Sequence, residues 1–108
     1  MPIFPIHLTG FTTWNREHSR EAEFRAFILR SPQEFIFEVT YQRIDYWGAL
    51  QRNSHGFFEG EFSAKDGHNT WGGRANCTLI ESDGQYTLDG SWYEEGYTYA
   101  WHSDLEPK

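Results

Sequence analysis

The sequence predicts an all-β fold, an antiparallel up-and-down meander of about eight strands that closes into a small barrel. Two observations carry this prediction. From Glu34 onward, in EFIFEVTYQR, apolar and polar side chains alternate with the period of two of a half-buried strand. Farther along, Asp66-Gly67, Asp83-Gly84 and Glu95-Gly96 each place a glycine where a hairpin turn needs a positive φ. Strands that follow one another through such tight turns form a meander.

The expected strands cover most of the chain, and only the second is ambiguous. Their approximate bounds are residues 3–9, 21–30, 34–43, 46–53, 57–64, 70–81, 85–94 and 97–105. In the second segment, strong helix formers and the helical spacing of Phe24, Phe27 and Ile28 make a short helix near residues 15–29 the alternative. We favour a strand, because Ser31-Pro32-Gln33-Glu34 suits a type I turn that leads directly into the next strand.

The turns also determine which side chains face the interior, because a shift of one residue in strand pairing exchanges the two faces. We expect Asp83-Gly84 and Glu95-Gly96 to be two-residue turns and residues 65–68 to be a four-residue loop. The resulting pairs are Leu79 with Leu88, Cys77 with Gly90, Trp92 with Tyr99, Gly90 with Trp101, Phe62 with Trp71, and Gly60 with Gly73. In all three hairpins the predicted inner face is apolar and rich in aromatic rings, whereas the outer face is mostly polar.

Three pieces of the second half resemble the aromatic and glycine-rich strands of avidin-type and lipocalin-type barrels, the calycin group. They are Trp71-Gly72-Gly73, Gly90-Ser91-Trp92-Tyr93 and Tyr99-Ala100-Trp101. The similarity covers roughly the last 60 residues and concerns architecture rather than a motif. It implies a barrel with a ligand cavity at one end. The polar biotin ligands of avidins have no residue-by-residue match here, and the lipocalin Gly-x-Trp signature is replaced by Thr13-Trp14-Asn15, so biotin binding is not implied.

Composition limits the classes of function. A chain of 108 residues fits one domain, residues 1–108, whose core must consist largely of rings because 19% of the residues are aromatic. The net charge of −7 and the nine scattered basic residues argue against a nucleic-acid partner. Cys77 is the single cysteine, and neither a signal peptide nor a long apolar segment is recognisable, so we expect a cytoplasmic protein without a membrane partner.

The ring-rich inner face is the candidate ligand site. The predicted ligand-binding residues are Phe62, Trp71, Trp92, Tyr99 and Trp101 for stacking, with Asn76 or a tyrosine for polar contacts. Glycines at positions 60, 73 and 90 lie on the same predicted face. Each of these glycines either makes room for a neighbouring ring, which is the more common role of glycine in a strand, or leaves room for a ligand. No cofactor is expected.

The titratable residues indicate no reaction, and no catalytic residue is identified. The five histidines have neither HxH nor HExxH spacing, so no metal site is expected. The hairpin register puts His102 opposite Asp89, a carboxylate that would raise the pKa of the imidazole, but this pair belongs to the outer face. Glu94 and Glu95, next to a hairpin tip, are expected to be solvated.

Three functions are compatible with these observations. The favoured one is a small-molecule-binding barrel whose aromatic pocket holds an apolar or aromatic ligand. The first alternative is an acidic interaction protein, of the inhibitor or immunity type, that binds a basic protein partner. The second is a barrel enzyme, such as a cyclase, isomerase or hydro-lyase. A homodimer is compatible with each of the three.

Overall fold

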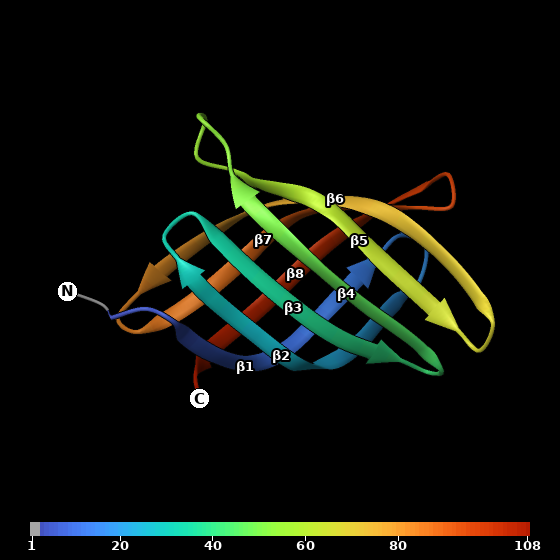
Figure 1. Ribbon diagram of the computed structural model, residues 1–108, viewed down its shortest axis with the longest axis horizontal. Helices are drawn as coiled ribbons and strands as arrows, with labels where there is room; N and C mark the ends of the chain where they lie inside the picture. The colour runs from blue at the N-terminus through green and yellow to red at the C-terminus, as the bar shows by residue number, and fades with distance from the viewer. Residues whose placement is uncertain (1–2) are drawn as a thin grey trace.

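Eight antiparallel strands in sequence order form a closed barrel in the computed structural model, which describes residues 3–108 (Figure 1). The last strand pairs with the first and closes the sheet. The strands are β1 (Ile6–Asn15), β2 (Ser19–Ser31), β3 (Glu34–Tyr41), β4 (Ile44–Arg52), β5 (Phe58–Asp66), β6 (Asn69–Ser82), β7 (Gln85–Glu94) and β8 (Tyr97–Pro107). The predicted all-β meander and its closure into a barrel are confirmed, and this architecture is the one that the resemblance to calycins implied.

The described residues contain no helix, so the alternative of a short helix near residues 15–29 is wrong. Residues 19–31 form β2, as we favoured. Phe24 and Phe27 are both buried although they are three residues apart, because the pairing with β3 shifts between Phe24 and Ala26. Such a bulge adds one residue to a strand and interrupts its period of two. The apparent helical spacing is therefore the signature of a β-bulge.

The first strand also differs from its predicted bounds of residues 3–9. β1 begins at Ile6 and continues to Asn15, and its residues from Leu8 onward pair with β8. Leu8, Thr12 and Trp14 keep the period of two of a strand, but the polar Thr12 is buried and the apolar Phe11 is 52% exposed. This inversion of polar and apolar residues concealed the second half of the strand from sequence analysis.

The predicted register is right in two of the three hairpins. Around Asp83-Gly84 and Glu95-Gly96, all four predicted pairs are present: Leu79 with Leu88, Cys77 with Gly90, Trp92 with Tyr99, and Gly90 with Trp101. The β5–β6 pairing is two residues away from the prediction. Its corrected pairs are Phe62 with Gly73, Ala64 with Trp71, and Gly60 with Ala75. Asp66 pairs with Asn69, so the turn has two residues rather than four, and a shift of two leaves every side chain on its predicted face.

Aromatic rings fill the interior, and Trp92 lies at their centre. Its ring stacks on Phe62, with 3.9 Å between centroids and 20° between planes. Four further rings contact it with centroid distances between 5.1 and 5.9 Å: Trp14, Phe37, Tyr46 and Trp101. Trp92 is only 1% exposed. A second group of rings, Phe27, Phe35 and Phe58, continues the core away from Trp92.

Two inner-face glycines allow this packing rather than leaving room for a ligand. A methyl group at Gly73 would overlap the Phe62 ring, and one at Gly90 would overlap the Asn76 carbonyl and lie 2.6 Å from Cys77 Cα. The space beside Gly73 is therefore filled by a ring, and the space beside Gly90 by the backbone of β6. Between its two ends, the interior of the barrel is therefore filled by protein atoms.

Gly90→Ala should lower the free energy of unfolding by about 1–3 kcal/mol or more, because the overlapping atoms belong to the backbone and cannot move aside as a side chain can. Urea unfolding followed by tryptophan fluorescence measures this change. Gly72→Ala is a milder comparison, since its new methyl group would lie 3.0 Å from the Phe62 carbonyl oxygen without overlapping it, and it should therefore lower stability less than Gly90→Ala does. Equal stability of Gly90→Ala and wild type would contradict this account of the packing.

Candidate functional site

The candidate site lies at one end of the barrel, which we call the barrel mouth. This end carries the β1–β2, β3–β4, β5–β6 and β7–β8 turns, whereas the C label in Figure 1 marks the opposite end. A cavity of about 10 Å³ is found there, close to the volume that one water molecule needs. Its lining residues are Trp14, Arg20, Tyr41, Tyr46, Trp92, Glu94 and Tyr99. They come from six different strands.

Strand periodicity explains why these side chains meet. On β7, Leu88, Gly90 and Trp92 face the interior, and Glu94 is the next residue in that series. On β2, Arg20 lies four residues before the buried Phe24, which corresponds to two repeats of the two-residue period of a strand. Alternating residues of a strand share one face, so both charged residues are directed inward where their strands reach the mouth.

Glu94 accepts hydrogen bonds from three neutral donors. Trp92 Nε1 lies 3.0 Å from Oε1, and Oε2 accepts from Trp71 Nε1 at 2.7 Å and from the Tyr46 hydroxyl at 3.0 Å. The two oxygens of an ionised carboxylate can accept hydrogen bonds from three donors at once, as they do here. Glu94 is half-buried, so the prediction that it is solvated holds only in part, because it judged this residue by its proximity to the turn and not by its face of the strand.

Tyr46 is held in its neutral form. Burial raises the pKa of its hydroxyl, and the charge of Glu94 and the hydrogen bond to it raise the pKa further. A neutral phenol keeps its proton and continues to donate to the carboxylate. The negative charge at the mouth thus remains on Glu94 rather than spreading to the tyrosine.

Trp14 contributes a donor that has no partner. Among the buried side-chain nitrogens and oxygens of residues 3–108, its Nε1 is the one without a hydrogen bond. The residue is only 4% exposed and lines the cavity. A buried unsatisfied donor is costly, by about 1–3 kcal/mol, so this N–H favours the arrival of an acceptor, from water or from a ligand.

Arg20 lies over the mouth. Its guanidinium carbon is 5.5 Å from the centre of the Tyr99 ring and 5.9 Å from that of Tyr41, within the range of a cation–π contact. The side chain is exposed. Among the described residues it makes no ion pair within 4.0 Å, so it is held over the cavity by ring faces rather than by Glu94.

Three of the predicted ligand-binding residues meet at the mouth. Trp92 and Tyr99 line the cavity, and Trp71 donates to Glu94. The residues that sequence analysis missed there are Trp14, Arg20, Tyr41, Tyr46 and Glu94. The sequence did contain a signal for them. The alternation of inward-facing and outward-facing residues, continued to the last residue of each strand, places these side chains on the inner face.

The other predicted ligand-binding residues lie elsewhere. Phe62 is buried against Trp92, and Trp101 is buried with its Nε1 donating to Thr12 Oγ1 at 2.7 Å. Asn76 lies between the buried Ala75 and Cys77, so it belongs to the outer face of β6. The structure thus brings Asn76 to neither the mouth nor the core.

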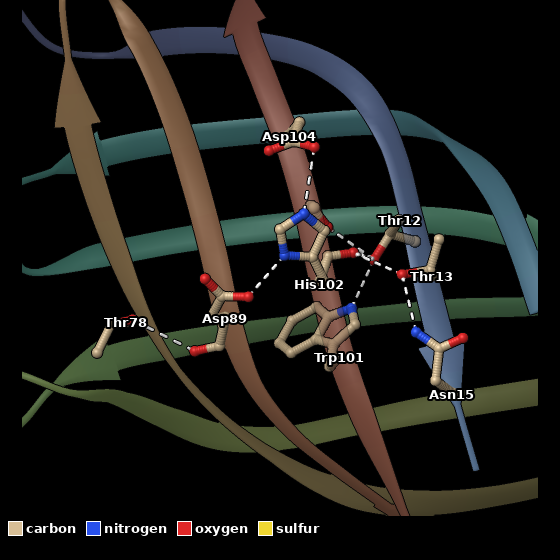
Figure 2. Close-up of polar contacts among 9 residues, drawn as sticks. Thr12, Thr13, Asn15, Thr78, Asp89, Trp101, His102 and Asp104 are labelled. Atoms are coloured by element: carbon tan, nitrogen blue, oxygen red, sulfur yellow. Dashed lines mark hydrogen bonds and ion pairs between the residues drawn. The ribbon is translucent and has the colours of Figure 1, made fainter. Parts of the chain in front are cut away.

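The predicted pair of His102 and Asp89 forms on the outer face (Figure 2). Nδ1 of His102 lies 2.6 Å from Asp89, and Nε2 lies 3.2 Å from Asp104, a second carboxylate that was not predicted. The hydrogen bond to Asp89 raises the pKa of His102; partial desolvation opposes this rise, and Asp104 adds to it. The imidazolium ion can donate to both carboxylates at once and thereby link β7 to β8.

Comparison of the sequence with models of protein families and with curated protein sequences finds no match. In the part of the chain that the structure describes, no helix is long and apolar enough to cross a membrane. The same residues include no group of three or more His, Cys, Asp and Glu side chains arranged to hold a metal ion. The site is therefore interpreted from its own geometry.

Glu94→Ala should destabilise the barrel by about 1–3 kcal/mol or more, because the buried Trp92 N–H would lose its acceptor. The indole signals of Trp71 and Trp92 in ¹⁵N–¹H spectra should shift as their hydrogen bonds are lost. Glu95→Ala, in the exposed turn beside it, should change stability by no more than about 0.5 kcal/mol. Equal effects of the two substitutions would show that Glu94 is not an essential acceptor.

The raised pKa of His102 should make stability depend on pH. Below 6.5, the ordinary value, the imidazole is protonated in both states, so its interactions with Asp89 and Asp104 stabilise the folded state fully. This stabilisation should disappear as the pH rises above 6.5 and through the folded-state pKa. Because the side chain is 40% exposed, solvent screening keeps the effect small.

Urea unfolding at pH values on both sides of 6.5 tests this expectation. The free energy of unfolding of wild type should fall, relative to that of His102→Gln, as the pH rises. His68→Gln, in the exposed β5–β6 turn, should keep the wild-type dependence on pH. A constant difference between wild type and His102→Gln at every pH would refute the assigned role.

Proposed function

We propose that the protein binds a small molecule at the barrel mouth. The observation that supports this proposal most strongly is the unpartnered N–H of Trp14 beside a ring-lined cavity that also contains Glu94. Binding pockets typically combine apolar walls with a few convergent polar groups, and the mouth has both. A buried donor without a partner lowers the stability of the fold, so stability does not explain why it is there.

The solid core limits where the ligand can lie. Phe62 and Trp101 are buried in contact with Trp92, so the ligand stays at the mouth instead of entering the barrel. Arg20 is exposed, so its side chain has room to move away from the entrance, which would enlarge the cavity. Tyr41 and Tyr99 then offer ring faces to an apolar or flat surface of the ligand.

Screening a library of small apolar, aromatic and charged compounds by ¹⁵N–¹H spectroscopy tests the proposal. Each of the five tryptophans gives one indole signal, and these signals report on different places. A ligand at the mouth should shift the signals of Trp14, Trp71 and Trp92 but not that of Trp47, which is exposed on the outer face of β4. Mouth signals that no compound shifts, or shifts confined to Trp47, would refute the proposal.

The outer surface supports a second candidate function, the binding of a basic protein partner. Phe11 is 52% exposed and pairs with Glu23 on one side and Asp104 on the other. An exposed ring between carboxylates suits a basic surface that also offers an apolar contact. A mouth that stays empty throughout the library screen would favour this second function.

A further inference from the structure

We infer that the ligand of the barrel mouth is a small organic cation, with an ammonium or guanidinium head group for Glu94 and a separate acceptor atom for the N–H of Trp14, and that Arg20 occupies the place of this head group in the free protein. The inference rests on the proposed function and adds to it the chemical class of the ligand. It follows from the charge of Glu94, the arrangement of the rings and the position of Arg20.

The charge at the mouth is not neutralised by its hydrogen bonds. All three donors to Glu94 are neutral: two indole N–H groups, of Trp71 and Trp92, and the phenol of Tyr46. In the described part of the chain no basic side chain lies within 4.0 Å of this carboxylate. A partly buried charge interacts more strongly with an opposite charge than an exposed one does. The mouth therefore attracts a cation.

The rings around Glu94 suit the same class of ligand. Ring faces carry partial negative charge and attract ammonium and guanidinium ions within about 6 Å, most strongly where water is excluded. Trp14 lies near two of the tyrosines, with centroid distances of 5.9 Å to Tyr41 and 6.0 Å to Tyr46. Together with Tyr99 and Trp92, these rings line the same cavity as Glu94. A neutral ligand would gain from ring contacts, and a neutral donor from a hydrogen bond to Glu94, but neither would gain from the attraction between opposite full charges.

Arg20 already contacts two of these rings. Its guanidinium, which is a planar cation, lies over the rings of Tyr41 and Tyr99. The entrance of the mouth therefore already holds a cation in the free protein. The guanidinium lies more than 4.0 Å from any carboxylate of the described residues, so a free cation that reaches Glu94 would bind better than Arg20 does. Arg20 then acts as a competing internal ligand, and competition of this kind weakens the apparent affinity for an external one.

Arg16 provides a matched control. It belongs to the same β1–β2 turn region and also lies over a tyrosine ring, with its guanidinium carbon 4.2 Å from the centre of Tyr97. Unlike Arg20, it does not line the cavity. Arg16→Ala and Arg20→Ala remove the same charge and the same kind of ring contact, and Arg16→Ala also removes an exposed ion pair with Glu17, but only Arg20→Ala should empty the entrance of the mouth.

The experiment titrates wild type, Arg16→Ala and Arg20→Ala with tetramethylammonium and methylguanidinium, and with tert-butanol and phenol as neutral probes. Indole signals in ¹⁵N–¹H spectra report binding at the mouth, and an unchanged Trp101 signal shows that each variant is folded. Arg20→Ala should bind at least one of the cations about tenfold more tightly than wild type or Arg16→Ala. The neutral probes should bind at least about tenfold more weakly than that cation.

The contrary outcomes separate the two proposals. Mouth signals that shift with phenol or tert-butanol but not with the cations would overturn the cation inference and leave small-molecule binding intact. No shift with any probe in any variant would count against both. Equal affinity of Arg16→Ala and Arg20→Ala for the cations would overturn the role of Arg20.

Discussion

The hydrogen bond from the Trp92 indole to Glu94, 3.0 Å long, connects the two parts of this structure. Trp92 is the ring that contacts five other rings, so its position sets the packing of the core. Its N–H is buried and needs an acceptor, which the inward-facing Glu94 supplies. The same carboxylate collects the donors of Tyr46 and Trp71 and places a negative charge at the barrel mouth. Core stability and the chemistry of the mouth thus share one interaction.

The kinds of ring are distributed along the barrel according to their polar groups. Phe27, Phe35 and Phe58 pack away from Trp92 and form an apolar portion of the core. Tryptophan and tyrosine predominate at the mouth, where their N–H and O–H groups can reach partners or water. A barrel filled in this way has no room for a ligand in its middle, so an external molecule can meet the polar rings of the interior only at the mouth.

Carboxylates on the two faces of the sheet have different consequences. Asp89 and Asp104 hold His102 on the outer face, where solvent screens the interaction and the histidine itself supplies the positive charge. Glu94 is screened less and is bound only by neutral donors. At the mouth the carboxylate is half-buried and surrounded by rings, which is why the cation inference concerns Glu94 rather than the exposed acidic residues of the outer surface.

The sequence by itself determined the all-β class, the meander, the tight turns and the inward face of β5 to β8, because alternation and turn residues act locally along the chain. It missed the β5–β6 register by two residues, and it could not distinguish the bulge after Phe24 from helical spacing. The site was predicted only in part: Trp71, Trp92 and Tyr99 reach the mouth, whereas their partners Trp14 and Glu94 were missed. Glu94 meets Trp71 and Trp92 within the β6–β7 pair, whereas Trp14 joins them only when β8 pairs with β1. Closure is a property of the whole sheet, so only the tertiary structure decided that the candidate site joins residues of β1 and β2 to those of β7 and β8.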